Sequence, residues 1–159
     1  MLVVLRGNSG SGKSTVAVAL QRALAPPVAV LEQDYFRRII YDEREQESMA
    51  HAKLLEVAAN HCLSSGHHVV LEGILNATRY STMLKRVAET ADDARFYAFD
   101  LAFEETVRRH AGRRKASEFG EDQMRSWYHG WQPLSFVHER RIGRSETCDE
   151  VVQRILAGT

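Results

Sequence analysis

The chain has 159 residues, of which 44% are hydrophobic, 26% are charged and only three are proline. This composition supports a folded core and excludes a disordered, collagen-like or low-complexity chain. The 21 Lys and Arg residues balance the 21 Asp and Glu residues. That balance argues against a dedicated non-specific nucleic-acid binder, because such proteins need an excess of positive charge.

Short apolar runs alternate with longer segments of helical periodicity, a pattern typical of an α/β fold with a parallel sheet. The apolar runs predict strands at residues 2–5, 28–31, 68–71, 95–99 and 141–144. Helices are expected at residues 13–25, 35–41, 47–64, 82–90, 103–115, 121–131 and 149–156. We therefore expect a three-layer α/β/α architecture in which helices wrap five parallel strands, folded as a single domain over residues 1–159.

The two cysteines, Cys62 and Cys148, are far apart and form no CxxC pair. This predicts a reducing compartment without a disulfide framework. Cys62 falls on the apolar face of the helix expected at 47–64 and is interpreted as a core residue. The N-terminus lacks the features of a signal peptide, and no segment approaches the roughly 20 apolar residues of a membrane span. We expect a cytoplasmic protein, monomeric or homodimeric, with no membrane partner.

The clearest motif lies between the first strand and the first helix, and it matches G-x-x-x-x-G-K-[ST]. It comprises Gly7, Asn8, Ser9, Gly10, Ser11, Gly12, Lys13 and Ser14, followed by Thr15. The glycines allow backbone N–H groups to turn towards phosphate oxygens, and the helix N-terminus adds partial positive charge. Lys13 can reach the β- and γ-phosphates, and the Ser14 hydroxyl can bind Mg²⁺. The motif predicts a nucleoside triphosphate site.

A P-loop also needs an acidic partner for its Mg²⁺, normally at the end of a neighbouring strand. Glu72 ends one apolar run and Asp100 ends another. We favour Glu72, acting through water, because Gly73 and the loop at 74–76 indicate open space beside it. A solvated carboxylate at a strand end is the alternative for either residue.

Asp34 follows the second strand, at the edge where open α/β sheets bind ligands, and Arg37 comes three residues later. On a helix this spacing puts both on one face. Asp34 could therefore deprotonate an acceptor hydroxyl while Arg37 holds an acidic group of the acceptor. The alternative is that Asp34 simply caps the short helix that follows.

The basic stretch at 108–115 is interpreted as part of a lid over about 108–122, hinged at Gly112. Closure would bring Arg109 and Arg113, one helical turn apart, to the transferring phosphoryl. A solvated basic helix face is the alternative. Further along, Trp127, Tyr128 and Trp131 either wall a pocket or pack in the core.

Several stretches of the chain resemble small P-loop kinases that group with the kinase domain of bacteriophage polynucleotide 5′-hydroxyl kinase, and more distantly chloramphenicol phosphotransferase and zeta toxins. They are GNSGSGKST, the D-x-x-R element from Asp34 to Arg37, LEGILNATR, FDLAFEETVRRHAGR and MRSWY. One departure is that the strand-end acid is aspartate in the polynucleotide enzyme, whereas this chain has Glu72. The polynucleotide enzyme also carries a phosphatase domain and a tetramer contact with no counterpart here.

The resemblance implies that Asp34 is the general base and that Arg37 contacts the acceptor. It implies that Arg113 acts at the phosphoryl with Arg109 in support, and that Glu72, Asn76 and Arg79 face the substrate. We therefore expect an ATP–Mg²⁺ phosphotransferase with a hydroxyl acceptor. Neutral net charge favours a small molecule or a nucleoside or nucleotide over a long polynucleotide. Alternatives are a polynucleotide 5′-hydroxyl kinase, an antibiotic phosphotransferase and a regulatory nucleotide-binding module.

Overall fold

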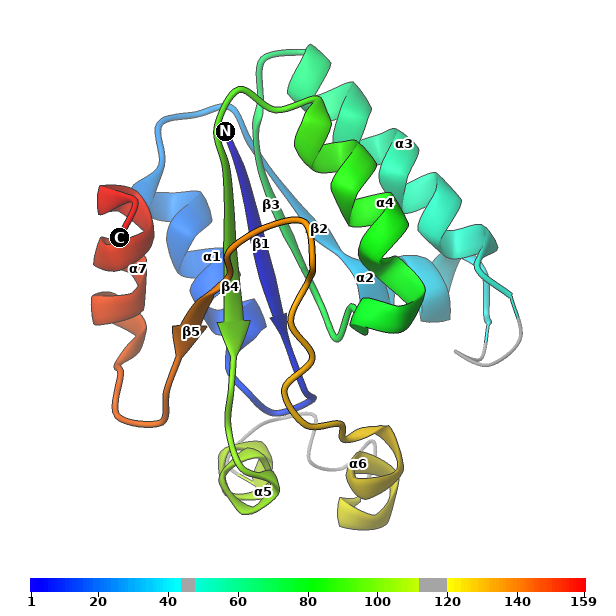
Figure 1. Cartoon of the computed structure of the whole chain (residues 1–159), viewed down its shortest axis with the longest axis vertical. Coiled ribbons are helices and arrows are strands. Elements are labelled where there is room, and N and C mark those ends of the chain that lie inside the picture. Colours follow the sequence, from blue (N-terminus) through cyan, green and yellow to red (C-terminus); the bar gives the residue numbers. More distant parts are fainter. Residues whose placement is uncertain (44–47, 112–119) are drawn as a thin grey trace.

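The computed structural model describes residues 1–43, 48–111 and 120–159. Five parallel strands form one sheet in the order β2-β3-β1-β4-β5 (Figure 1). The strands are β1 (Leu2–Gly7), β2 (Val28–Glu32), β3 (His68–Gly73), β4 (Ala94–Phe99) and β5 (Arg140–Ile142). The helices are α1 (Lys13–Ala23), α2 (Gln33–Tyr35), the π-helix η1 (Phe36–Ile40), α3 (Ala50–Ser64), α4 (Ala77–Glu89), α5 (Phe103–Ala111), α6 (Glu121–Trp127) and α7 (Cys148–Ala157).

The central strand β1 is apolar on both faces because helices cover both sides of the sheet. Its side chains alternate, so that Val3 and Leu5 pack with α1 and α7, whereas Leu2 and Val4 pack with α3 and α4. The resulting α/β/α layers and the five-stranded parallel sheet confirm the fold expected from the sequence (Figure 1).

Because all strands are parallel, their carboxyl ends meet at a single edge of the sheet. Helices α5 and α6 lie beyond that edge, below the arrowheads in Figure 1. The P-loop motif follows β1 at the same edge, between β3 on one side and β4 on the other. The fold therefore gathers the segments that carry the predicted site.

Some element boundaries differ from those expected. Helix α4 begins at Ala77 and not at residue 82, because the Asn76 side chain caps it by accepting a hydrogen bond from the Thr78 N–H at 2.9 Å. The helix expected at 35–41 is instead the short α2 followed by η1, and the helix expected to reach residue 131 ends at Trp127. Most of the predicted lid, residues 112–119, lies outside the described residues, and so does the 44–47 stretch.

Cys62 packs against the core on the α3 and α4 side while staying partly exposed. None of the helices in the described part of the chain is long and apolar enough to cross a membrane.

Candidate active site

The P-loop packs so tightly against its neighbours that two of its glycines have no room for a side chain. A Cβ atom on Gly10 would lie 2.4 Å from the Thr106 carbonyl oxygen of α5. A Cβ on Gly7 would lie 2.8 Å from Phe99 Cβ at the end of β4. Gly10 also has φ of 79°, which glycine adopts without strain. The loop is therefore held in shape by β4 and α5.

Lys13 lies across this loop and is only 7% exposed. Its Nζ donates hydrogen bonds to the Asn8 carbonyl oxygen at 2.9 Å and to Ser11 Oγ at 3.4 Å. The Ser11 side chain is fully buried. The ammonium group is thus positioned within the loop, where the sequence motif predicts that phosphate oxygens bind.

Glu72 contacts the hydroxyl that is predicted to bind Mg²⁺. The Ser14 Oγ donates to Glu72 Oε1 at 2.7 Å, and Glu72 is 5% exposed. The parallel register pairs Leu5 of β1 with Glu72 of β3, which brings the carboxylate beside the start of α1. Asp100, the alternative acid, instead forms an ion pair with Arg141. A hydroxyl and a carboxylate fit Mg²⁺, which takes few protein ligands and completes its shell with phosphates and water.

Asp34 lies one strand further along the same edge. Its carboxylate accepts from Arg37 Nη2 at 2.7 Å and from Arg38 Nη1 at 3.4 Å. The interpretation of Asp34 as a helix cap is wrong, because Glu32 occupies the N-cap position of α2 and Asp34 lies within the first turn. The Asp34 side chain is 44% exposed, so it remains accessible to a substrate.

A series of contacts connects Asp34 to the P-loop. Ser14 bonds Glu72, the neighbouring Gly73 packs against Gln33, and Gln33 directly precedes Asp34. A Cβ on Gly73 would approach Gln33 Cβ to 2.6 Å. The structure thus brings Asp34, Glu72 and Ser14 to one edge of the sheet.

Arg109 on α5 bridges the P-loop and the segment after β5. It donates to the Ser11 carbonyl oxygen at 3.0 Å through Nη1 and to the Arg144 carbonyl oxygen at 3.0 Å through Nη2. Its Nε donates to Glu105 Oε1 at 2.6 Å. Hydrogen bonds from Arg108 and then Arg109 lower the pKa of Glu105 from 4.5 to about 2. Arg109 is therefore more than part of a solvated basic face.

The remaining predicted site residues are less closely joined. Arg113 lies outside the described residues. Asn76 uses its side chain to cap α4, and Arg79 lies in the first turn of that helix. None of the contacts found between described residues connects Arg79 to Asp34, so the substrate role of Asn76 and Arg79 stays a prediction.

The family of the chain follows from comparison with known proteins. The family model AAA_33, described as an AAA domain, matches residues 2–134. The chain belongs to this family. A search of curated proteins found no match.

Solved structures resemble this AAA domain over nearly its whole length. The APS kinase CysC of Mycobacterium tuberculosis, in complex with AMPPNP and APS, is 21% identical, with a TM-score of 0.76 and coverage of 98% of this chain and 95% of that chain. A gluconokinase from Sinorhizobium meliloti 1021 is 20% identical, with a TM-score of 0.69 and coverage of 98% and 89%. These likenesses show a kinase-like P-loop fold.

A chain of the Pnkp1/Rnl/Hen1 complex is 27% identical, with a TM-score of 0.57. The match covers 68% of the chain described here but only 38% of the matched chain. The resemblance to P-loop kinases expected from the sequence is thus confirmed at the level of the fold, and the comparisons include small-molecule kinases beside Pnkp1.

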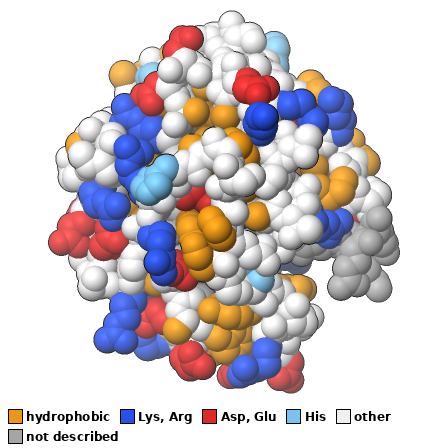
Figure 2. Space-filling model, in the orientation of Figure 1, with side chains coloured by type: hydrophobic (Ala, Val, Ile, Leu, Met, Phe, Trp, Pro, Cys, Tyr) orange, Lys and Arg blue, Asp and Glu red, His pale blue; other side chains and the backbone are white. Residues whose placement is uncertain are grey.

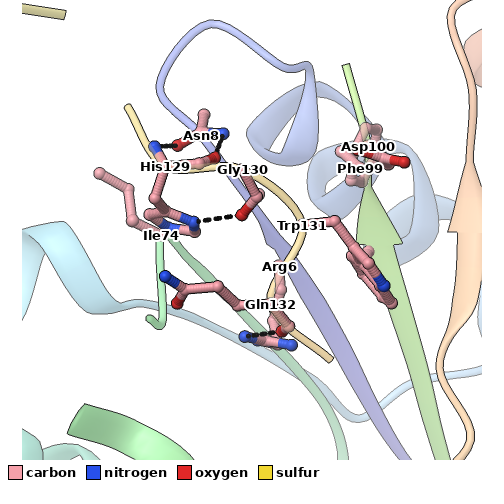
Figure 3. A pocket seen from close by; sticks show the side chains of 11 residues that line it. Arg6, Asn8, Ile74, Phe99, Asp100, His129, Gly130, Trp131 and Gln132 are labelled. Atoms are coloured by element: carbon pink, nitrogen blue, oxygen red, sulfur yellow. Dashed lines mark hydrogen bonds between the residues drawn. The ribbon is translucent and has the colours of Figure 1, made fainter. Parts of the chain in front are cut away.

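The structure adds one P-loop contact that the sequence analysis missed. The Asn8 side chain donates to the His129 carbonyl oxygen at 2.7 Å and accepts from the His129 N–H at 3.1 Å. This pair of hydrogen bonds joins the P-loop to the segment after α6 (Figure 3). The residues are 121 positions apart, and the motif offers no local signal for the contact.

A pocket lies beside this contact, at the same edge of the sheet (Figure 3). It is lined by Arg6, Gly7 and Asn8, by Ile74, by 98–100 and by 129–132. Trp131 lines it, whereas Tyr128 packs edge-on against Phe103 and donates its hydroxyl to the Leu101 carbonyl oxygen at 3.0 Å. Each of the two interpretations of the aromatic residues therefore holds for a different residue. Trp131 lines a pocket, whereas Tyr128 packs against the protein interior.

Arg6 lines the pocket and takes part in a buried ion pair. Its Nη1 lies 2.5 Å from Glu139 Oε1, and its Nε donates to the Leu75 carbonyl oxygen at 2.9 Å. The sequence offered one signal for this ion pair: Arg6 is a charged residue in an otherwise apolar strand, and buried charges are usually paired. The pair holds the segment before β5 against the end of β1.

Proposed function

We propose that this AAA domain transfers the γ-phosphoryl group of ATP–Mg²⁺ to a hydroxyl of a small-molecule, nucleoside or nucleotide acceptor. The observation that carries the proposal is the contact between Ser14 and Glu72, one strand away from Asp34. It aligns the P-loop hydroxyl, an acidic metal partner and a candidate base along a single edge. Phosphoryl transfer depends mainly on such positioning and on electrostatic stabilisation.

Each residue has a defined role in this proposal. Lys13 and Arg113 stabilise charge on the γ-phosphoryl, with Arg109 supporting the P-loop. Ser14 would hold Mg²⁺ directly and Glu72 would hold it through water, and the ion would supply positive charge to the phosphate oxygens. Asp34 orients the acceptor hydroxyl and takes its proton as the oxygen attacks the γ-phosphorus. The bond to the bridging oxygen breaks, and ADP leaves.

The surface and the neighbouring structures favour a compact acceptor. On the face seen in Figure 2, Lys and Arg side chains are interspersed with Asp and Glu and form no continuous basic surface. A long nucleic acid would be bound mainly through a continuous basic surface, because its phosphates carry the negative charge. Among the structural neighbours, one is a gluconokinase and another is an APS kinase bound to APS. Arg37, which pairs with Asp34, would contact an acidic group of the acceptor.

The likeness to the Pnkp1 chain favours one specific alternative, a 5′-hydroxyl of an oligonucleotide. A panel of sugars and sugar acids, nucleosides, nucleotides, aminoglycosides and 5′-hydroxyl oligonucleotides distinguishes these acceptors. The measurement is ATP consumption that depends on the added acceptor. An ATPase rate unaffected by every member of the panel would favour a regulatory nucleotide-binding module.

The Asp34→Asn variant tests the assigned base. We expect transfer to fall by about 100-fold or more, because the amide cannot accept the hydroxyl proton. The Kd for ATP should stay within about twofold, since Asp34 does not contact the P-loop. Asp42→Asn is the matched control, because it removes the same charge from an exposed position on the same segment. Transfer by Asp34→Asn at near the wild-type rate would contradict the assignment.

A further inference from the structure

A series of hydrogen bonds, mostly buried, connects α3 and α4 to residues 33–43, the segment that carries Asp34 and Arg37. Gln33 Nε2 donates to the Tyr80 hydroxyl at 3.0 Å, and that hydroxyl lies 2.8 Å from His51 Nε2. His51 Nδ1 lies 2.6 Å from Glu43 Oε2. Tyr80 and His51 are fully buried, and Gln33 is 2% exposed. Buried polar groups linked in this way fix the elements that carry them.

The hydrogen bonds have a consistent direction. An ionised Glu43 carboxylate can only accept, so His51 Nδ1 carries the hydrogen. Hydrogen bonds from Ser48 and His51 lower the pKa of Glu43, which keeps it ionised. In the neutral imidazole, Nε2 then accepts from the Tyr80 hydroxyl, whose oxygen accepts from Gln33. The series thus runs from the Gln33 amide to the Glu43 carboxylate without a mismatched pair.

The two ends of this series bracket the predicted acceptor residues. Gln33 directly precedes Asp34 and packs against Gly73 of β3. At the other end, the Glu43 N–H donates to the Arg37 carbonyl oxygen at 2.9 Å. Residues 33–43 are therefore tied to α3 and α4 at both ends, with Asp34 and Arg37 between them.

The outer part of the same segment has little packing of its own. Ile39 is 65% exposed and Ile40 is 48% exposed. Segments with few buried contacts open locally at low free-energy cost unless other interactions hold them. Within the segment Phe36 packs against the core. The position of Asp34 relative to the sheet edge therefore depends on this contact together with the hydrogen bonds at the ends of the segment.

We propose that Gln33, Tyr80, His51 and Glu43 are positioning residues for phosphoryl transfer, which hold Asp34 and Arg37 in the reacting geometry. This inference rests on the proposed function for its catalytic consequence. Its structural part, the tethering of residues 33–43, can be measured separately. Small displacements of a catalytic group lower the rate strongly, so a residue without substrate contact can affect turnover.

The Tyr80→Phe variant removes the hydroxyl in the middle of this series of hydrogen bonds, and the phenylalanine ring occupies the space of the tyrosine ring. The matched control is Tyr97→Phe, because Tyr97 is also fully buried and its hydroxyl donates to the Thr159 carbonyl oxygen at 3.2 Å. Tyr97 packs in the other core, with α1 and α7. Both variants lose a buried hydroxyl, and only Tyr80→Phe breaks the series.

Hydrogen–deuterium exchange on the protein without nucleotide tests the tether. In Tyr80→Phe, we expect amides of residues 33–43 to exchange about tenfold faster than in the wild type, while P-loop amides keep their rates. Tyr97→Phe should leave residues 33–43 unchanged. Equal exchange of this segment in both variants and in the wild type would overturn the inference.

Activity is then measured with whichever member of the acceptor panel the wild type phosphorylates. We expect Tyr80→Phe to lower kcat by about tenfold while the KM for ATP stays within about twofold. His51→Gln, whose amide can still accept from Tyr80, should retain more activity than His51→Leu. If the wild-type protein phosphorylates no member of the panel, the proposed function is refuted. The hydrogen–deuterium exchange of residues 33–43 then still tests whether the hydrogen bonds hold this segment. A loosened segment with unchanged kcat refutes the positioning role.

Discussion

The candidate site has two sides, which are held in different ways: the P-loop (residues 7–15), here called the donor side, and residues 33–43, here called the acceptor side. On the donor side, Ser11 is fully buried and Lys13 nearly so, and Gly10 touches the α5 backbone. On the acceptor side, Tyr35 is 54% exposed and Ile39 is 65% exposed. Tight packing around its glycines holds the P-loop, together with hydrogen bonds to Arg109 and His129. Residues 33–43 have fewer packed side chains, Phe36 among them, and depend more on directed polar contacts. If the proposed function is correct, the donor side suits a constant ligand, and the acceptor side can change its specificity at little cost to the core.

The largest expected effect comes from filling the tight space on the donor side. Gly10→Ala would place a Cβ 2.4 Å from a backbone oxygen, so we expect the free energy of unfolding to fall by about 3 kcal/mol or more. The control is Gly66→Ala, since Gly66 has φ of 80° and Gly10 has φ of 79°. A Cβ on Gly66 meets nothing within 4 Å.

Urea unfolding of both variants separates steric overlap from backbone strain. Gly66→Ala should cost only the strain of a left-handed alanine, about 1 kcal/mol. If the two variants lose equal stability, packing does not fix the P-loop and the contrast between the two sides fails.

A smaller effect is expected at the boundary between the sides, at Glu72. Glu72→Gln keeps the size of the side chain but removes the charge next to Ser14, so we expect the apparent Mg²⁺ affinity or the transfer rate to fall about 10- to 100-fold. Titrating Mg²⁺ in the transfer assay measures this. Asp100→Asn is the control, because Asp100 pairs with Arg141 instead. A greater Mg²⁺ defect in Asp100→Asn would reverse the assignment.

The smallest effect concerns the carboxylate that holds Arg109 near the P-loop. Because the pKa of Glu105 in the folded protein is lowered to about 2, its ionised form stabilises the fold above pH 4.5. That contribution is lost as the pH falls from 4.5 towards about 2. The Tm difference between the wild type and Glu105→Gln, measured at successive pH values, should therefore shrink on acidification. A difference that stays constant with pH would contradict this role.

Local sequence signals were sufficient to predict the fold and to place the P-loop motif between the first strand and the first helix. The glycines and Lys13 of the P-loop act through nearby backbone, and the apolar runs mark strands buried on both faces. The start of α4 also has a local signal, because Asn76 is a preferred N-cap residue directly before this helix.

Contacts between distant parts of the chain, on both sides of the candidate site, could not be predicted. Gln33 meets Tyr80 across 47 positions, and Asn8 meets His129 across 121. No fixed sequence spacing predicts either contact, because which distant residues meet is set by how the helices and loops pack on the sheet. The π-helical turn of η1 likewise has no periodic signature, so the sequence pattern predicted an ordinary helix there.

The hydrogen bonds between Asn8 and His129 have an optical consequence. The chain contains two tryptophans, Trp127 and Trp131, and His129 lies midway between them. Both tryptophans therefore lie within two positions of the residue whose backbone is bonded to the P-loop. Tryptophan emission of the unlabelled protein reports on this short stretch alone, so a nucleotide that shifts Asn8 can be followed by intrinsic fluorescence in real time.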